Sequence, residues 1–457
     1  MGLISSIRQQ MAGWRHRLGE LWWYTALMFV VQVAGMGVNF YTGLWVIPSC
    51  VSQADLGAIL PLTQLAAFLA VPLGMLMAPF GKYLNTFMAK GEPGKAKALL
   101  WDVLRLSLVA AVIMTVYTVL AAPFIQVRMR VAGVGIVALL CVMAFLNGIK
   151  PVITNSTQAL KRFNLMVVGG MVGAPLRLVL VWVLAGSFGL VGYLGALCGV
   201  EIFGLAIGAL SIYWLLGPHV PRQSYREHWG EMVSYSTPLV ITTVLGTLAG
   251  TVEPFVIRHR LPEIESAAYY VISRFSEICG FVGGTVCMFL FPLVSERFER
   301  GQCTRRLLWH ANVLNVLIGG FMVGFLVLAG AWMLGLRPQW NAYQGYAEQM
   351  WRLGLIQVLN VPIAVFLTHE IACRRFGFLW FSTLERLVVA GLLYGMTGWE
   401  FFRPYLPPSW WDLVNQLSPC RLGYIVNFSV FSQIFLLLSV LGFVWHHRRK
   451  GMVDTVL

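Results

Sequence analysis

Long apolar runs follow one another along the whole sequence, and they limit the fold more than any other feature. Each run is longer than about 18 residues, so as a helix it can cross a hydrocarbon core of about 30 Å. Only 11% of the 457 residues are charged and 58% are hydrophobic, whereas about 25% of an ordinary soluble domain is charged. The sequence therefore predicts an all-α polytopic membrane protein, and a water-soluble enzyme is excluded.

The runs predict twelve transmembrane helices in two six-helix bundles. At about 22 residues per span, twelve spans leave no room for a large soluble domain. The predicted spans are about 22–48, 57–81, 106–123, 131–149, 164–185, 189–216, 233–257, 266–294, 309–336, 350–372, 377–398 and 424–445. The predicted parts are an amphipathic inner-surface helix (1–21), the N-terminal bundle (22–216), a cytoplasmic linker (217–232), the C-terminal bundle (233–445) and a basic cytoplasmic tail (446–457).

The basic residues predict the orientation. A net charge of +14 would suggest nucleic acid in a soluble chain, but here 22 of the 33 Lys and Arg fall in the alternate loops that share a side with both termini. Such loops face the cytoplasm, so both termini are predicted to be cytoplasmic, and no nucleic-acid partner is expected. The eight basic residues predicted outside are Arg128, Arg130, Arg258, Arg260, Arg337, Arg352, Arg403 and Arg421.

The cysteines and histidines indicate no metal site. The eight cysteines include no CxxC pair, and most lie at predicted membrane depth, where they pack as small apolar residues. Cys50 and Cys420 both fall in predicted outside loops, so the sequence allows a disulfide between them without requiring it. His369-Glu370 lacks the second histidine of a zinc protease helix.

A weak internal repeat relates the two halves. Asp55-Leu56-Gly57 lies 210 residues before Glu265-Ser266-Ala267, and Lys90-Gly91 lies 210 residues before Arg300-Gly301. Because six predicted spans separate the two copies, both halves have the same orientation in the membrane. Repeats of this kind are typical of transporters.

Charged residues at membrane depth are the first candidates for a binding site, because each costs about 2.5–3.5 kcal/mol on insertion scales. Arg274 and Glu277 share a helix face, and Glu253 lies on the preceding span. We expect them to form a cationic site for an anionic substrate. An Arg274–Glu277 pair that only neutralises itself is the alternative. The predicted cations at the outer mouth are Arg258 and Arg260, and those at the inner mouth are Lys82 and Lys90.

Two amides on the first span extend this predicted site. Gln32 and Asn39 are seven residues apart and so lie on one helix face. They are predicted to line a cavity, although hydrogen bonds between helices explain them equally well.

Helix breakers occur at corresponding places in the two halves. Such pairs mark moving helices that line a transport site, so gating is predicted, with kinks that only shape the packing as the alternative. The predicted gating residues are Pro72, Pro79, Gly283, Gly284 and Pro292.

Small residues predict the packing of the fifth and sixth spans. Only residues 186–189 separate these spans, so they must be antiparallel neighbours. The spacings Gly169-xxx-Gly173 and Gly195-xxx-Gly199 predict close helix packing. Arg177, Glu201 and Glu385-Arg386 are interpreted as local ion pairs or interfacial residues.

Several segments follow the pattern of one known group. They are Val51-Ser-Gln-Ala-Asp-Leu-Gly57, Lys90-Gly-Glu-Pro-Gly94, Gly189-Leu-Val-Gly-Tyr193, Ser234-Tyr-Ser-Thr-Pro238, Glu265-Ser-Ala-Ala-Tyr-Tyr270, Ser273-Arg274 and Phe291-Pro-Leu-Val-Ser-Glu296-Arg297. With their flanking helices they resemble the multidrug/oligosaccharidyl-lipid/polysaccharide (MOP) superfamily, particularly Wzx-type flippases and polysaccharide export proteins.

The resemblance implies a flippase in a bacterial inner membrane that moves a lipid-linked, undecaprenyl-pyrophosphate type saccharide by alternating access. Cations in the lumen would receive the pyrophosphate, which carries over to Arg274 and less directly to Gln32, Asn39 and Glu253. The implied partners are the lipid-linked saccharide, membrane lipids and polysaccharide polymerase or export components. No cofactor is expected, and coupling is to H⁺, Na⁺ or the membrane potential.

Other functions stay open. A drug/cation antiporter of the same fold would favour acidic residues in its lumen, and the seventh and eighth spans carry both signs of charge. A non-transporting envelope scaffold would make that charge dispensable. An enzyme is not expected, because Asp55 and Asp412, the outside aspartates, each stand alone.

Overall fold

The structure is a computed structural model that describes residues 20–74, 77–131, 133–159, 163–216, 219–299, 304–372, 377–397 and 422–449. This part of the chain is helical and contains no strand. The predicted surface helix over 1–21, the loop with Cys420 and most of the tail after 446 lie outside the described residues.

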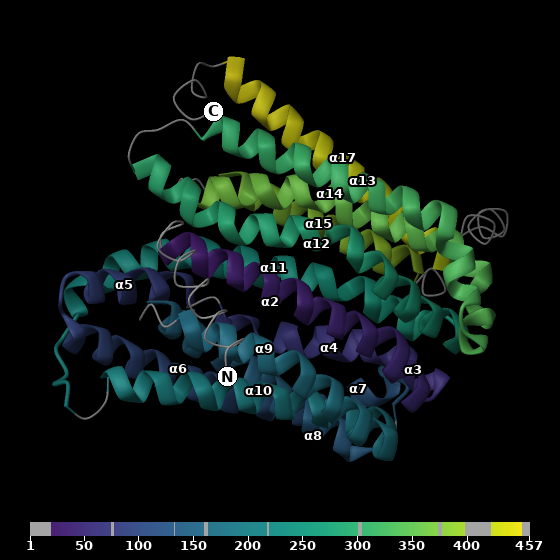
Figure 1. The fold of residues 1–457 in the computed structure, drawn as a ribbon, viewed down its shortest axis with the longest axis horizontal. Coiled ribbons are helices and arrows are strands. Elements are labelled where there is room, and N and C mark those ends of the chain that lie inside the picture. The colour runs from purple at the N-terminus through teal and green to yellow at the C-terminus, as the bar shows by residue number, and fades with distance from the viewer. Residues whose placement is uncertain are drawn as a thin grey trace, which may run out of the picture. The chain divides into compact units, whose positions relative to one another are not determined.

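The first half of the chain forms six successive helical segments (Figure 1). They are α2 (Glu20–Tyr41) with η1 (Thr42–Val46) and α3 (Ile47–Cys50); α4 (Gln53–Gly74) with α5 (Met77–Ala89); α6 (Pro93–Leu120); α7 (Ala122–Met129) with α8 (Val134–Ala159); α9 (Phe163–Leu180) with η2 (Val181–Ala185); and α10 (Gly186–Leu216).

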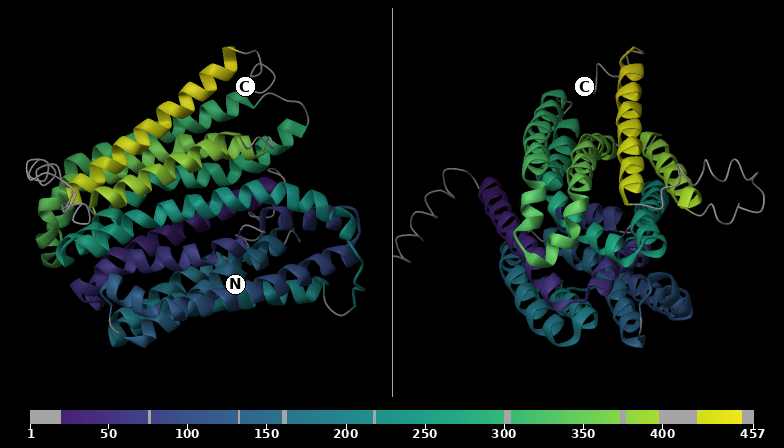
Figure 2. Two further views of the ribbon diagram at one scale, coloured as in Figure 1. Left: turned by 180° about the vertical axis from the view of Figure 1, so that it is seen from behind. Right: turned by 90° about the vertical axis from the view of Figure 1, so that its right-hand side faces the viewer.

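The second half forms six more. They are α11 (Trp229–Arg260), which follows the short η3 (Arg226–His228); α12 (Glu263–Glu299); α13 (Arg305–Gly335); α14 (Ala347–Ala372), which follows η4 (Pro338–Tyr346); α15 (Gly377–Thr397); and α17 (Leu422–Arg449). Within this half α14 packs against α12, α13 and α17 (Figures 1 and 2).

The described helices agree with a polytopic membrane protein. Nine stretches of the described residues are long and apolar enough to cross a membrane, and the bent pair α7–α8 makes a tenth. The nine count Val167–Leu210 once, although Gly189 interrupts it with φ 56°, and they do not include the 37-residue α12. These additions account for the twelve predicted spans.

Exposed apolar side chains mark lipid-facing surfaces. On α6, Val112 is 55% and Ile113 is 58% exposed, and on α13 Phe321 is 71% and Leu328 is 87% exposed. A soluble protein rarely exposes such continuous apolar faces. Lipid, in place of water, is therefore the solvent for these helices.

Local sequence explains where several helices begin and turn. Ser52 precedes α4 and acts as its N-cap, because its hydroxyl oxygen accepts the backbone N–H of Asp55. The Asp55 carboxylate in turn accepts the Ser52 hydroxyl at 2.8 Å. Gly91 (φ 73°) separates α5 from α6, and such a φ favours glycine. Just after the predicted turn at 186–189, a Cβ on Gly192 would collide with the backbone of Leu184.

The chain divides into two compact units. Unit 1 comprises residues 1–51, 69–122 and 133–237, and unit 2 comprises 52–68, 123–132 and 238–457. Two pieces of the first half, most of α4 and most of α7, therefore belong with the second half. The predicted division at 217–232 into two bundles stays a prediction.

Each unit has an apolar core of its own. In unit 1 a buried cluster joins α5, α6, α8 and the segment before α11, and its largest members are Phe80, Tyr83, Phe87 and Tyr225. In unit 2, Phe378 packs edge-on against Phe366, with ring centroids 4.9 Å apart.

Candidate functional site

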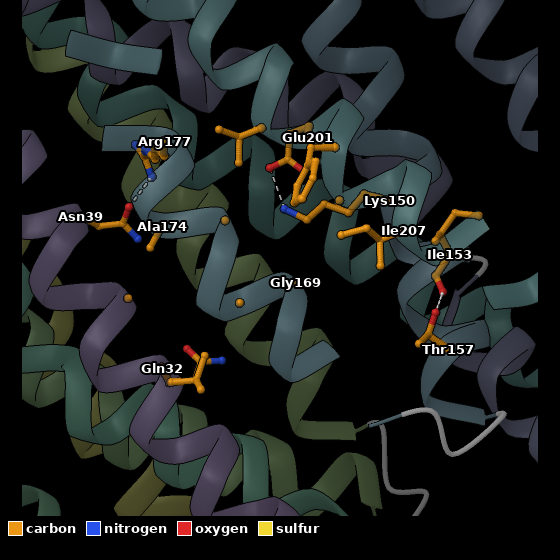
Figure 3. A pocket seen from close by; sticks show the side chains of 18 of the residues that line it. Gln32, Asn39, Lys150, Ile153, Thr157, Gly169, Ala174, Arg177, Glu201 and Ile207 are labelled. Carbon is orange, nitrogen blue, oxygen red and sulfur yellow. Dashed lines mark hydrogen bonds and ion pairs between the residues drawn. The ribbon is translucent and has the colours of Figure 1, made fainter. Parts of the chain in front are cut away.

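A cavity of about 540 Å³ lies within unit 1 and is lined by residues of α2, α8, α9 and α10 (Figure 3). Gln32 and Asn39 line it from α2, as predicted for a cavity-lining face. Small residues of α9, which packs against α2, also line it: Gly169, Gly170, Gly173 and Ala174. The volume suits a small polar ligand or headgroup.

The glycines of α9 open this cavity. The predicted close packing through Gly169 and Gly173 is wrong, because a Cβ at either position would have no atom within 4 Å. Gly195 is equally open, and only Gly199 has a close neighbour, Leu180. The missing side chains leave space on the cavity side of α9.

Arg177 supplies a positive charge to the cavity wall. One of its Nη atoms donates to the Asn39 Oδ1 at 3.2 Å, and the other donates to the Tyr193 hydroxyl at 3.4 Å. Figure 3 shows the guanidinium facing Asn39. Both partners are neutral, so the arginine's charge is not cancelled by either.

A second cation lies further along the wall but is paired. Lys150 of α8 contacts Glu201 of α10, with 2.7 Å between Nζ and Oε1. The side chains are 51% and 26% exposed, so water reaches both. The charged residues among those that line the cavity are thus Lys150, Glu201 and Arg177, which together carry one net positive charge.

These three charged residues were not predicted as site residues. Arg177 and Glu201 were interpreted as local ion pairs or interfacial residues, and Lys150 was not singled out. One signal in the sequence does identify Arg177: the residues three and four positions away are Gly173, Ala174, Leu180 and Val181, which include no acid. An arginine at membrane depth with no acid within reach on its own helix needs a partner elsewhere.

Glu253 lies in unit 2 and joins three helices. Its Oε1 accepts the Tyr269 hydroxyl of α12 and its Oε2 accepts the Ser429 hydroxyl of α17, both at 2.9 Å. Both partners are neutral donors. Glu253 is thus an acidic group at membrane depth that is held by hydroxyl groups.

Arg274 and Glu277, also in unit 2, form the pair that was left open as the alternative. An Nη of Arg274 lies 2.8 Å and 2.9 Å from the two carboxylate oxygens of Glu277, and the guanidinium lies over the ring of Tyr270 at 5.2 Å. The charge of Arg274 is therefore balanced within its own helix. A role for Arg274 in substrate binding stays a prediction.

The other predicted site residues are distributed over both units. Arg258 is fully buried and donates to backbone carbonyl groups of Met129 and Arg130. Lys90 is exposed in the turn between α5 and α6, and Lys82 belongs to α5. The predicted gating residues fall in three helices: Pro72 in α4, Pro79 in α5, and Gly283, Gly284 and Pro292 in α12, which runs continuously through them.

No metal site is found in the described part of the chain, where no three His, Cys, Asp or Glu side chains come together.

Comparison with known proteins identifies the fold. No protein-family model and no curated protein sequence matches the chain. The structure is similar to an inward-facing multidrug resistance MATE family transporter of the MOP superfamily, with a TM-score of 0.69 and 16% identity over 93% of this chain and 98% of that one. It is also similar to an outward-facing MATE transporter of the same superfamily, with a TM-score of 0.60 and 15% identity over 94% of this chain and 96% of that one.

A third similar structure is a MOP superfamily transporter from Pyrococcus furiosus. Its TM-score is 0.60 and its identity 15%, over 94% of this chain and 96% of that one, and the reverse polarity of its binding pocket suggests a different function for it. The chain therefore has the fold of the MOP superfamily, and the resemblance seen in the sequence is confirmed at the level of the fold.

Proposed function

We propose that the chain is a membrane transporter that moves a lipid-linked saccharide with an anionic headgroup from the inner to the outer leaflet by alternating access. The observation that carries the proposal is the unit 1 cavity, where the charge of Arg177 is met only by the neutral groups of Asn39 and Tyr193. An uncompensated cation among amide and hydroxyl groups favours an anionic, hydroxyl-rich ligand.

The chemistry of the cavity suits such a headgroup. A phosphate or sugar that enters hydrocarbon loses its hydrogen bonds, at several kcal/mol for each unsatisfied polar group. Arg177 can hold a phosphate through two parallel N–H groups, and Gln32 and Asn39 each carry an amide that both donates and accepts. These residues replace the water that the headgroup gives up.

The polarity of the cavity argues against a cationic drug as the main substrate. For the Pyrococcus furiosus transporter, reverse polarity of the binding pocket suggests a different function. We apply the same reasoning here, because a drug cation would be repelled by Arg177 and the cavity's one acid, Glu201, is already paired with Lys150.

Glu253 is our candidate for energy coupling. A carboxylate that is held only by the hydroxyl groups of Tyr269 and Ser429 can take up H⁺ or Na⁺ without first breaking an ion pair. Coupling to H⁺, Na⁺ or the membrane potential is therefore part of the proposal, and it also supports the second candidate function, a cation-coupled antiporter of drugs or small molecules. A non-transporting envelope scaffold would need neither Arg177 nor Glu253.

The proposed location is the cytoplasmic membrane of a bacterium, with both termini cytoplasmic. The excess of basic residues in the loops on that side supports this orientation. The proposed partners are the lipid-linked saccharide, the surrounding lipids and components of a polysaccharide polymerase or export system.

Accumulation of the lipid-linked saccharide in cells that lack the protein tests the function. The deletion strain is complemented with the parent, Arg177→Ala, Arg274→Ala or Glu253→Gln at equal expression. We expect intermediates trapped on the inner leaflet, which the parent clears and Arg177→Ala does not. If the deletion causes no accumulation and no second flippase is present, the saccharide is not the substrate, and efflux of a cationic dye becomes the next assay.

Whether Arg274→Ala and Glu253→Gln clear the accumulated saccharide shows what role each residue has in transport. Failure of Arg274→Ala supports its predicted place in the substrate path, whereas full clearance leaves Arg274 as the structural partner of Glu277. Failure of Glu253→Gln supports coupling through that carboxylate.

A further inference from the structure

Four arginines and a histidine gather in unit 2, where α7 and α11 both end. The arginines are Arg128, Arg130, Arg258 and Arg260, and together with His259 we call them the basic cluster. An Nη of Arg128 lies 2.6 Å from Nε2 of His259, and the guanidinium of Arg128 lies over the ring of Phe124 at 5.5 Å. All of these residues belong to unit 2.

Two of the arginines have a structural role. Each donates hydrogen bonds to the backbone carbonyl groups at the C-terminal end of the helix that precedes the other arginine or contains it. Arg258, from α11, donates through Nε to Met129 O at 2.7 Å and through Nη2 to Arg130 O at 3.1 Å, at the end of α7. Arg130 donates to His259 O at 2.9 Å and Leu261 O at 3.1 Å, at the end of α11. Carbonyl groups at a helix C-terminus lack intrahelical partners and carry partial negative charge, so this exchange stabilises both ends.

Hydrogen bonds to carbonyl groups do not neutralise the positive charges of these arginines. In the part of the chain that the structure describes, none of the four guanidinium groups forms an ion pair with a carboxylate. Asp55 and Glu263 are close enough to act on Arg258 electrostatically, but the four arginines outnumber these two acids. The Nη1 of the fully buried Arg258 has no hydrogen-bond partner.

The orientation of the chain makes this surplus more telling. Basic residues are disfavoured in loops on the non-cytoplasmic side of the membrane, and only eight of the 33 Lys and Arg are predicted on that side. Four of those eight are the arginines of the basic cluster. An energetic bias that works against each arginine calls for a counter-charge, and among the described residues Asp55 and Glu263 supply only part of it.

The surroundings point to a lipid as the source of that counter-charge. On the same eight-residue helix as Arg128, Phe124 is 56% and Val127 is 74% exposed. Exposed apolar residues beside arginines are typical of a short helix at the membrane interface, where acyl chains cover the apolar face and headgroups meet the cations. A soluble anion would use the arginines but not Phe124 or Val127.

We propose that the basic cluster binds the phosphate group of a lipid at the non-cytoplasmic face of the membrane. Arg128 and Arg260 are only partly buried and supply the direct contacts, since a guanidinium holds phosphate bidentately, while Arg130 and Arg258 hold the two helix ends in place. The phosphate belongs either to an anionic phospholipid of the bilayer or to the lipid carrier of a saccharide that has crossed. The inference does not depend on the proposed function, because a phospholipid would occupy the site in any membrane protein with this cluster.

Lipid retention by the purified full chain tests the proposal. Native mass spectrometry compares phosphatidylglycerol, phosphatidylcholine and undecaprenyl phosphate at equal concentration on the parent, Arg128→Gln, Arg260→Gln and the double variant. Arg337→Gln is the matched control, because Arg337 is also predicted outside but lies over the ring of Trp340 and is not part of the basic cluster. These substitutions leave Arg130 and Arg258 intact, so the variants are expected to fold.

We expect the parent to prefer an anionic lipid to phosphatidylcholine. Each substitution in the cluster should weaken binding of that anionic lipid about fivefold, the effect of one basic residue near a membrane surface. Arg337→Gln should bind as the parent does. A loss confined to phosphatidylglycerol identifies a bilayer lipid, and one confined to undecaprenyl phosphate identifies the saccharide carrier. Equal retention of all three lipids by the parent and the double variant would overturn the proposal.

Discussion

The hydroxyl of Ser266 donates a hydrogen bond to the carbonyl oxygen of Gly57 at 3.1 Å, and Ser266 is 98% buried within unit 2 (2% exposed). These residues belong to the two copies of the sequence repeat, in which Leu56 corresponds to Ser266 and Gly57 to Ala267. Equivalent segments of a twofold repeat meet where the axis passes between them. The repeat itself, which was inferred from short sequence matches, stays a prediction.

Gly57→Ala tests how tightly the two copies pack. A Cβ at Gly57 would lie 2.5 Å from the Ser266 Oγ and 3.0 Å from the backbone nitrogen of Ala267, and the backbone cannot move aside as a flexible side chain can. Overpacking of this kind costs about 1–3 kcal/mol. We expect the thermal midpoint in detergent to fall by about 5 °C. Gly246→Ala is the control, because a Cβ there meets nothing within 4 Å, and an equal midpoint for both variants would refute tight packing.

Arg258→Lys tests the exchange of hydrogen bonds between α7 and α11. Lysine keeps the charge but lacks the planar fork that reaches Met129 O and Arg130 O together. Losing one hydrogen bond from a charged group costs about 1.5–3 kcal/mol, so we expect the free energy of unfolding to fall by about that amount. Arg105→Lys, at an exposed position, should change nothing. A stable Arg258→Lys would mean that charge alone, without the fork, holds these helix ends.

Glu253→Gln tests energy coupling. Glutamine can still accept from Tyr269 and Ser429 but cannot take up a proton, so we expect binding of the substrate to persist while gradient-driven transport falls by about tenfold or more. Transport by vesicles with an imposed H⁺ or Na⁺ gradient measures this. Asp55→Asn, a change in the first turn of α4, controls for the loss of one negative charge. Undiminished gradient-driven transport by Glu253→Gln would remove Glu253 from the coupling mechanism.

The segment before α11 carries a pH-dependent contact. Glu227 Oε1 lies 2.7 Å from the Lys95 Nζ, and the hydrogen bond and charge of Lys95 lower the pKa of the Glu227 carboxyl below its usual 4.5. A lowered pKa means that the contact stabilises the folded protein at neutral pH and that this stabilisation is lost as the pH falls through the folded-state pKa. Glu227→Gln should therefore melt below the parent at pH 7, and the two should melt together once the pH lies below the lowered folded-state pKa of Glu227. A difference that persists at low pH would contradict this origin.

Hydropathy predicted the helices because a helix that crosses the hydrocarbon core needs a continuous apolar stretch of about 20 residues. The reversal between the fifth and sixth spans followed from Gly186-Ser187-Phe188-Gly189, and Gly189 does adopt a positive φ of 56°. The charged stretch over 82–105, in contrast, was predicted as a loop but is helical except for a short turn, since α5 reaches Ala89 and α6 begins at Pro93. Hydropathy reports where a helix leaves the lipid and says little about where the helix ends.

The cavity was only half predictable for a related reason. Gln32 and Asn39 share a face of one helix, so their spacing along the sequence indicated them. Arg177 and the Lys150–Glu201 pair come from α8, α9 and α10, and which residues these helices bring together depends on tertiary packing. Glycine spacing was misleading for the same reason, because Gly169 and Gly173 leave open space where the motif predicts a neighbouring helix.

Translocation in reconstituted vesicles tests the central claim most directly. A fluorescent polyprenyl-pyrophosphate-linked saccharide is placed in both leaflets, and a membrane-impermeant quencher reports how fast the inner pool reaches the outer surface. The account predicts rapid translocation by the parent, a rate at least about tenfold lower for Arg177→Gln because a charged hydrogen-bond donor is lost, and partial recovery in Arg177→Lys. Equal rates for the parent and Arg177→Gln at equal reconstitution, or no translocation by the parent, would contradict it.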